Sequence, residues 1–252
     1  MLTRRIIPCL DVKDGNVVKG VQFQNLRPMG DPLDMARRHV EGGADELCFL
    51  DVTASIEARP LLIDLIGRLS EVVFVPFTIG GGIRSVADAR EILRAGADKV
   101  GVNTAAVQRP ELLRELSEEF GAQCVVLSID TCSRGETWYV TTHGGRTLTD
   151  RPALDWARQA VDLGAGEILL NAIDTDGQRE GFSIGITDAV CRAVTVPVIA
   201  SGGAGGAEDF VKVFQKTGCS AALAASIFHD GSWTSNRLKE VLGERGIEVR
   251  LG

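Results

Sequence analysis

The sequence has no long apolar run, no cluster of basic residues and few aromatic side chains. No apolar run reaches the roughly 18 residues that a membrane-spanning helix needs. The first residues lack the apolar core and small-residue cleavage site of a secretory signal. The formal net charge is −7 without any Lys/Arg-rich run, which argues against a nucleic-acid or anionic-membrane partner. These absences predict a cytoplasmic protein.

Patterns that bind metals are also missing. The six cysteines form no Cys-x-x-Cys pair and no zinc-type array. Cys9, Cys48 and Cys124 fall within or beside apolar runs, which is typical of small buried residues in a reducing compartment. The three histidines are scattered, and His39, which follows two arginines, is expected on a helix surface. We therefore expect neither a metal nor another cofactor.

What the chain does have is a regular alternation of short apolar runs and charged, helix-like segments. The candidate strands span residues 5–11, 46–51, 75–79, 99–103, 123–130, 167–172, 198–201 and 221–224. Helix-like segments lie between most of them, among others at 31–42, 85–95, 110–120, 151–163 and 207–217. Eight such alternations in 252 residues, with no Pro/Ser-rich linker, predict one (β/α)₈ barrel domain over residues 1–252.

The two halves of the chain resemble each other. The segment VPFTIGGGIRSVADAREILRAGADKVGVNTAAV, from Val75, matches VPVIASGGAGGAEDFVKVFQKTGCSAALAASIF, from Val196. Leu10-Asp11 likewise matches Ile129-Asp130. We interpret this as a duplication of a half-barrel, with halves of about 1–122 and 123–252. Strand 1 then lies opposite strand 5 in the barrel.

Asp11 and Asp130 end these two opposite strands. Either aspartate alone is as readily explained as a turn residue or a helix cap. As an equivalent pair, they would meet at the carboxyl-terminal face, where barrels of this kind hold their active sites. Two carboxylates on opposite sides of a substrate can divide acid and base roles when their surroundings separate their pKa values.

Glycine-rich turns follow strands 3 and 7, at residues 80–82 and 201–203. Glycine lets backbone N–H groups approach an anion closely. The segments 103–104 and 225–226, after strands 4 and 8, would complete one anion site in each half. Tight turns without a ligand are the alternative, and neither segment fits a dinucleotide or nucleotide fingerprint. Two sites on opposite sides predict a substrate with a phosphate at each end.

Further polar residues are expected around the mouth of the barrel. Residues 16–31 are interpreted as a long polar loop, and such loops are often lids on this fold. Its Lys19 either reaches the substrate or is an ordinary solvated lysine. Candidates to bind substrate hydroxyls lie at or just past strand ends: Asp51, Asn171, Asp174 and Asp176.

The opposite face carries a set of charges near the starts of strands 1, 2, 4 and 6. The set is Arg5, Glu46, Lys99 and Glu167. Two cations and two anions in a ring could simply stabilise that end of the barrel through salt bridges. They could equally form a gate into the interior of the barrel. The residues alone leave both interpretations open.

Several motifs together resemble a known family. CLDVKDGNVVKGVQFQNL, FLDVTAS, GGGIRSVADAREILRAGADKVGVNTAAV, GAGEILLNAIDTDG, IASGGAG and AALAASIFH are similar to the cyclase subunit of imidazole glycerol phosphate synthase, from histidine biosynthesis. The similarity runs from about Leu2 to Leu251. It implies a lyase that combines ammonia with phosphoribulosyl-formimino-aminoimidazole carboxamide ribonucleotide. The products are imidazole glycerol phosphate and aminoimidazole carboxamide ribonucleotide.

The resemblance also implies roles for individual residues. Asp11 and Asp130 match the catalytic acid/base pair, and Lys19 matches the lysine of the mobile loop. The substrate-binding candidates are Asp51, Asn171 and Asp176. The phosphate-binding candidates are Gly82, Asn103, Thr104, Ser201, Gly203, Ala225 and Ser226. Arg5, Glu46, Lys99 and Glu167 match an ammonia gate, above a glutaminase (glutamine amidotransferase) partner docked on the amino-terminal face near Asp98, Lys99 and Gln123.

Two alternatives remain at this point. The sister isomerase of the same pathway shares the duplicated barrel, the two phosphate sites and the paired aspartates, but needs no ammonia. The second alternative is a degenerate barrel without catalytic activity, kept only as a partner subunit or phosphate-binding module. The sequence departs from many relatives at Thr131-Cys132 and from some at Asn171. Those departures concern fine substrate contacts rather than the reaction.

Overall fold

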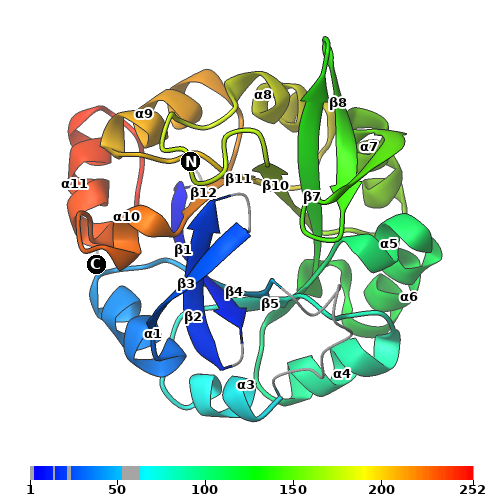
Figure 1. Cartoon of the computed structure of the whole chain (residues 1–252), viewed down its shortest axis with the longest axis horizontal. Helices are drawn as coiled ribbons and strands as arrows, with labels where there is room; N and C mark the ends of the chain where they lie inside the picture. The colour runs from blue at the N-terminus through cyan, green and yellow to red at the C-terminus, as the bar shows by residue number, and fades with distance from the viewer. Residues whose placement is uncertain (1–2, 14, 22–23, 53–62, 252) are drawn as a thin grey trace.

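The computed structural model describes residues 3–13, 15–21, 24–52 and 63–251. Its centre is a closed barrel of parallel strands (Figure 1). In order around the barrel these are β1 (Arg5–Lys13), β4 (Leu47–Asp51), β5 (Phe77–Gly80), β6 (Lys99–Val102), β7 (Val125–Arg134), β10 (Glu167–Ala172), β11 (Val198–Ser201) and β12 (Ala221–Ala224). Pairing of β7 with β10 and of β12 with β1 closes the ring. The predicted (β/α)₈ fold is confirmed.

Helices surround the barrel (Figure 1). They are α1 (Pro32–Glu41), α3 (Ile63–Ser70), α4 (Val86–Arg94), α5 (Thr104–Gln108), α6 (Glu111–Phe120), α7 (Ala153–Asp162), α8 (Ile184–Ala193), α9 (Ala207–Lys216), α10 (Ser226–His229) and α11 (Ser235–Glu244). Local chemistry sets where some of them begin. Asp31 accepts hydrogen bonds from the first N–H groups of α1, and Ser85 and Asp88 form a capping box on α4.

Apolar residues form two layers of core. The larger layer lies between the strands and the helices, where side chains such as Trp156 and Leu113 are fully buried. A second cluster includes Ile7, Cys9, Cys48, Leu169 and Ile199, one or two from each of several barrel strands. Alternate residues of a strand point to opposite faces, so residues 7 and 9 of β1 face the interior of the barrel. The predicted burial of Cys9 and Cys48 is confirmed, whereas Cys124, expected to be buried with them, is only half-buried.

The segment expected as a polar loop over 16–31 is not a loop. Residues Asn16–Val21 form β2 and residues Gln24–Gly30 form β3, and the two strands pair antiparallel with each other. β2 also pairs with the end of β1, where Val18 is the partner of Asp11. The loop prediction was wrong because the segment's glycine, asparagine and proline content hid a polar hairpin that continues the barrel strand.

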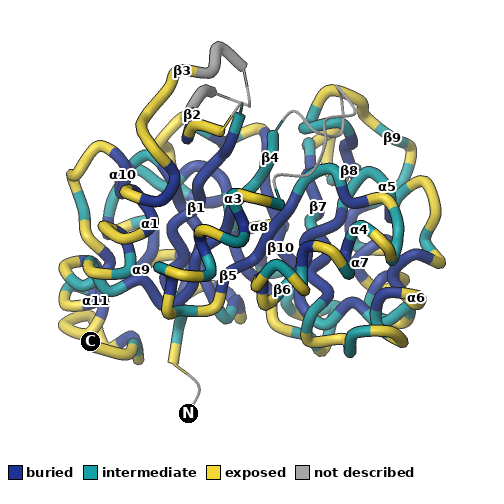
Figure 2. Tube along the Cα trace, turned by 90° about the horizontal axis from the view of Figure 1, so that it is seen from below, coloured by how far each residue is buried: buried dark blue, intermediate teal, exposed yellow. Residues whose placement is uncertain are grey.

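A similar hairpin follows β7 and was also missed. It consists of β8 (Thr137–Thr142) and β9 (Thr147–Pro152), with β8 paired to β7. The helix expected from 151 therefore starts at Ala153 as α7, because Arg151 and Pro152 still belong to β9. Both hairpins project from one end of the barrel, and the chain termini lie at the other (Figure 2).

Smaller differences concern single positions. A short 3₁₀ turn, η1 (Ala122–Cys124), replaces the first residues of the strand expected from 123. His39 does not lie on the helix surface: it is buried, and its Nε2 lies 3.1 Å from Nδ1 of His229. It follows Leu33 and Ala36 on the buried face of α1 at helical spacing. In the described parts of the chain, no helix is long and apolar enough to cross a membrane.

Candidate active site

A cavity of about 480 Å³ opens at the carboxyl-terminal end of the barrel. This volume is in the range of sites that hold small ligands. Twelve of the predicted site residues line it: Asp11, Asp51, Gly82, Asn103, Thr104, Asp130, Asn171, Asp176, Ser201, Gly203, Ala225 and Ser226. They come from both halves of the chain, and the closed barrel brings them together around one space.

The two aspartates enter this cavity from opposite strands, since β1 and β7 lie four strands apart in either direction around the barrel. Asp11 is 2% exposed, and the Cys9 thiol donates to its Oδ1 at 3.8 Å. Asp130 is also buried, at 8% exposed. A substrate that fills the cavity therefore has a carboxylate on each side of it.

Asp130 is held by two amides, one from Asn103, directly after β6, and one from Asn171 of β10. Asn103 Nδ2 donates to its Oδ2 at 2.8 Å, and Asn171 Nδ2 donates to its Oδ1 at 3.1 Å. Burial raises the pKa of Asp130 to about 6; the Asp176 charge adds to the rise, while the two amide hydrogen bonds oppose it. A carboxyl group with such a pKa can both hold and release a proton near neutral pH.

The amide of Asn103 can follow a change in protonation at Asp130. Its Oδ1 is buried and makes no hydrogen bond to any residue that the structure describes. If Asp130 carries a proton, a turn of the Asn103 amide offers this oxygen as an acceptor. Asn171 is more constrained, because its Oδ1 also accepts from the Ser201 hydroxyl at 3.3 Å. The pair thus supports either form of the acid.

The glycine-rich turns have the backbone that the sequence suggested. Gly81, Gly82, Gly202 and Gly203 all have φ between 72° and 97°, a region that other residues rarely adopt. A Cβ on Gly81 would lie 2.4 Å from the Asp51 carbonyl oxygen, so a side chain there has no room. Close contacts likewise leave no room for a side chain at Gly202 and Gly203.

The second element of each predicted phosphate site is the start of a short helix. Asn103 directly precedes α5, which begins at Thr104, and Ala225 directly precedes α10, which begins at Ser226. The first N–H groups of a helix have no partner within it and are suited to an anion. The two ends of the cavity therefore have the same construction.

Two predicted residues are not among the described residues that line this cavity. Lys19 belongs to β2, opposite Arg27 of β3, but its side chain lies outside the described part of the structure. Asp174 does not line the cavity. Its carboxylate accepts from the Cys132 thiol and from the Ser133 N–H at 2.7 Å, so it holds the extended end of β7.

Sequence reasoning missed some residues that do line the cavity. His143 lies in the turn between β8 and β9, and Arg179 in the segment after β10. They are the non-glycine residues with positive φ in the described chain, at 55° and 60°. The run His143-Gly144-Gly145 was the available signal, since two adjacent glycines also mark the predicted phosphate turns. Among described residues, no cluster of His, Cys, Asp or Glu could hold a metal ion.

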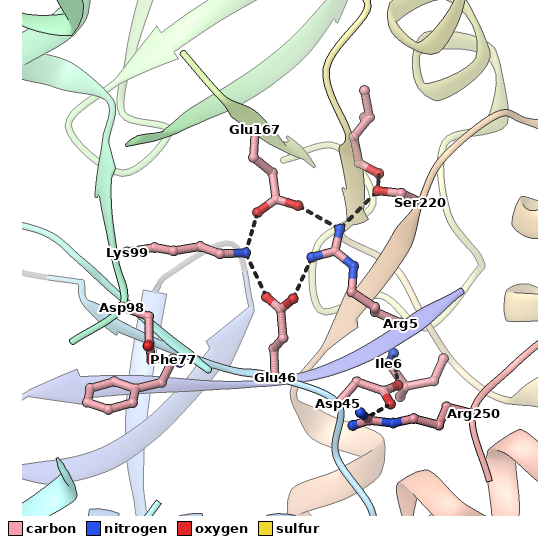
Figure 3. Close-up of polar contacts among 11 residues, drawn as sticks. Arg5, Ile6, Asp45, Glu46, Phe77, Asp98, Lys99, Glu167, Ser220 and Arg250 are labelled. Carbon is pink, nitrogen blue, oxygen red and sulfur yellow. Dashed lines mark hydrogen bonds and ion pairs between the residues drawn. The ribbon is translucent and has the colours of Figure 1, made fainter. Parts of the chain in front are cut away.

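The opposite end of the barrel is closed by a ring of four side chains (Figure 3). Arg5 contacts Glu46 and Glu167, each at 2.6 Å. Lys99 contacts the same two carboxylates, at 3.0 Å and 2.8 Å. Burial alone would lower the pKa of Lys99, but the attraction and hydrogen bonds of the two glutamates outweigh it and raise that pKa. Each carboxylate thus bridges both cations.

Comparisons with known proteins agree with the fold and the motifs. The family model described as "Histidine biosynthesis protein" matches residues 5–234. Relatives named "Imidazole glycerol phosphate synthase subunit HisF" are 57% identical in Solibacter usitatus, 56% in Thermococcus gammatolerans and 53% in Pyrococcus furiosus. Each alignment covers 100% of this chain and 99–100% of the relative. The chain belongs to the HisF family, the cyclase subunits of the enzyme imidazole glycerol phosphate synthase in histidine biosynthesis.

Proposed function

We propose that this barrel takes ammonia and phosphoribulosyl-formimino-aminoimidazole carboxamide ribonucleotide to imidazole glycerol phosphate and aminoimidazole carboxamide ribonucleotide. One observation carries the proposal. Two buried carboxylates, Asp11 and Asp130, line one cavity from opposite strands, with an anion-type turn on each side of them. Family membership supports the cyclase over the related isomerase.

In this reaction Asp11 and Asp130 move the protons. Ammonia must add to the substrate, a nitrogen–carbon bond must break, and the imidazole ring must close. Each of these steps transfers a proton, and a group whose pKa is close to the working pH does so efficiently. The pKa of about 6 that burial gives to Asp130 suits that task. Asp11 acts from the other side of the substrate.

The two phosphates of the substrate bind at the two ends of the cavity. Their sites are Gly82 with Asn103 and Thr104 at one end, and Ser201, Gly203, Ala225 and Ser226 at the other. Asp51, Asn171 and Asp176, together with Lys19 from β2, bind the ribose and ribulose portions between them. This assignment is supported by the short helix that begins at each end of the cavity.

Ammonia enters through the charged ring from a glutaminase subunit docked on the amino-terminal face. The name of the relatives, a synthase subunit, implies a partner. Phe74 and Leu251, which are 82% and 64% exposed, lie close to the strand starts on that side, where a docked subunit would cover them. Neutral ammonia then crosses the apolar interior around Ile7 and Leu169, where an ammonium ion would be costly.

We also infer that the single domain is a duplicated half-barrel, with halves of about 1–122 and 123–252. β1 and β7 each end in an aspartate and continue into an antiparallel hairpin. β6 and β12 are each followed by a short helix at a cavity end. Equivalent elements at equivalent places in both halves support an origin by duplication.

Ammonia-dependent turnover by the isolated chain tests the proposal. With ammonium chloride at alkaline pH, the purified chain should consume the bisphosphate substrate and release both products in equal amounts. The partner subunit and glutamine are left out, so that the barrel alone is examined. Failure with ammonia, combined with isomerisation of the precursor, would assign the isomerase reaction instead. Binding of the substrate without any turnover would identify a degenerate barrel.

A further inference from the structure

His143 approaches the cavity from the turn between β8 and β9, and no part of the assignment above uses it. It lines the cavity together with Thr104, which lies 39 residues earlier in the chain. Its neighbours Gly144 and Gly145 also have positive φ, at 64° and 81°. The turn is therefore a tight left-handed run in which one large polar residue stands where glycine is usual.

The strained backbone of His143 is held in place by a hydrogen bond to another part of the chain. A non-glycine residue in the left-handed region is strained and persists where the surroundings fix it. Here the His143 N–H donates to Thr104 Oγ1 at 3.0 Å. This bond fastens the turn to the first residue of α5, at one of the predicted phosphate sites. Because the Thr104 oxygen already accepts, its own proton remains available to a ligand.

The imidazole is oriented by a second chain of hydrogen bonds. Nδ1 of His143 lies 3.0 Å from Thr142 Oγ1, and that hydroxyl donates to the Thr147 carbonyl at 3.5 Å. With its proton directed to that carbonyl, the Thr142 oxygen can accept from an Nδ1–H of His143. Nε2 makes no hydrogen bond to any described residue. It is the ring atom that can meet a ligand.

We propose that His143 binds the substrate phosphate at the Gly82–Asn103–Thr104 end of the cavity, as an imidazolium, so that binding at this end takes up a proton. The ligand class is a phosphomonoester dianion. This inference rests on the proposed function for its natural ligand, although inorganic phosphate can test it directly. An imidazole beside a bound dianion is more readily protonated than in the free protein.

Other charged groups share the cavity and have to be separated from His143 in any test. They are the carboxylates Asp11, Asp51, Asp130 and Asp176 and the guanidiniums Arg84 and Arg179. On its own turn, Arg146 is the charged neighbour. Asp130, whose pKa burial raises to about 6, also changes charge near neutral pH. Comparison of a His143 variant with the parent, at two pH values, cancels what Asp130 contributes to both.

NMR of the histidine side chains gives a direct measurement, because the chain has only three histidines. Inorganic phosphate is added at pH 7 to the full chain labelled with ¹⁵N-histidine. We expect the His143 ring nitrogens to shift toward the imidazolium form as the site fills. His229 ends α10, whose first residue Ser226 lines the opposite cavity end, so its signal reports on that end separately.

The variant is His143→Asn, because asparagine tolerates positive φ and keeps the turn. We expect phosphate affinity to fall about fivefold at pH 6.5 and less than about twofold at pH 8.5, since the lost hydrogen bond is charge-assisted only when the ring is protonated. Arg179→Asn is the matched control: it changes the other positive-φ residue at the cavity. Any loss there should be equal at the two pH values, because a guanidinium stays charged.

An equal loss at both pH values for His143→Asn, or an unmoved His143 signal in a site that fills with phosphate, overturns the inference. An unchanged melting temperature of the variant shows that its structure is intact. The phosphate titration does not depend on turnover. If the titration behaves as expected and ammonia-dependent turnover is absent, the proposed function fails while the role of His143 in phosphate binding stands.

Discussion

The two ends of the barrel carry buried charge in opposite ways. At the amino-terminal end every member of the ring contacts two partners of opposite sign, and four contacts of 2.6–3.0 Å close it. At the carboxyl-terminal end Asp130 is held by neutral amides and faces the charge of Asp176. The same strands run between the two, since β1 begins with Arg5 and carries Asp11.

The charges of the ring are compensated by partners of opposite sign, whereas the carboxyl group of Asp130 is left able to take up and release a proton. Each ring carboxylate bridges two cations, so its charge is compensated within the ring. A carboxyl group that is buried with amides alone has its pKa moved toward neutrality, which costs stability and gives it acid/base use. Substitutions at the mouth should therefore change the rate of the reaction itself, and substitutions in the ring should change the passage of ammonia into the barrel.

The largest effect is expected from Asp11→Asn. The exchange keeps the size of the side chain and removes its ability to accept a proton. Loss of a general acid or base lowers turnover by about 10²–10⁴-fold. We expect kcat with ammonia to fall by about 10³-fold, while the affinity for the bisphosphate substrate, measured by calorimetry, changes less than about threefold.

The matched control for this variant is Cys9→Ser, two residues earlier on the same strand, whose side chain contacts Asp11. It perturbs the surroundings of the carboxylate but leaves the carboxylate in place, and should retain at least about a tenth of the turnover. Turnover of Asp11→Asn within tenfold of the parent would remove Asp11 from the mechanism and with it the contrast between the two ends.

The barrel, the aspartate pair and the charged ring could be predicted from the sequence because each follows from a local pattern. Strand–helix alternation gives the barrel, and the barrel then forces Asp11 and Asp130 to opposite sides of one mouth, because parallel strands end on the same face. The ring follows in the same way from residues near strand starts. These inferences need only the direction of each strand, which a sequence pattern reports well.

Other parts depend on contacts that no local pattern contains. His143 reaches the cavity only because its turn bonds to Thr104 across 39 residues. The pKa of Asp130 depends on its burial, which raises it, and on the amides of Asn171 in β10 and Asn103 after β6, which lower it. The segments of β2 and β3 give the pattern of a loop, because glycine, asparagine and proline interrupt the apolar alternation of a half-buried strand. His39, by contrast, carried a helical-spacing signal that the two preceding arginines masked.

The next effect concerns stability, through Asp130→Asn. The pKa of Asp130 is raised from 3.8 to about 6 in the folded protein. Between these values the folded state holds a proton that the unfolded state has lost, so the free energy of unfolding falls as pH rises through this window and stays lower above it. Two pKa units correspond to about 3 kcal/mol, which is an upper limit for the penalty.

Asparagine abolishes that penalty, and the free Asn103 oxygen can accept from its amide. Asp130→Asn should therefore be more stable than the parent at pH 8. Its gain in free energy of unfolding over the parent should be larger at pH 8 than at pH 4 by up to about 3 kcal/mol. Urea unfolding at both pH values measures this. The same exchange at Asp155, on the exposed surface of α7, is the control: it removes only an exposed ion pair to Arg158, so its effect should differ by less than about 1 kcal/mol between the two pH values. A difference as small as that for Asp130 would mean that its charge is compensated like that of the ring.

The smallest effect is expected at the ring, from Lys99→Ala. Arg5 remains to pair with Glu46 and Glu167, so the barrel should stay folded. Ammonia supplied in the solvent reaches the mouth directly, and its use should change less than about twofold. Ammonia released by the partner has to pass the altered ring, and we expect glutamine-dependent turnover to fall about tenfold, or about 1.4 kcal/mol in barrier.

The ratio of glutamine-dependent to ammonia-dependent turnover, each measured with saturating partner subunit, reports the passage of ammonia through the ring. Arg90→Ala serves as the control because it removes another ion pair, to Glu119 on the exposed side of α4 and α6. Exposed pairs contribute little, so this variant should leave the ratio unchanged. If Lys99→Ala lowers both activities equally, the ring acts on the barrel as a whole. In that case its four contacts stabilise the fold and do not control an entrance.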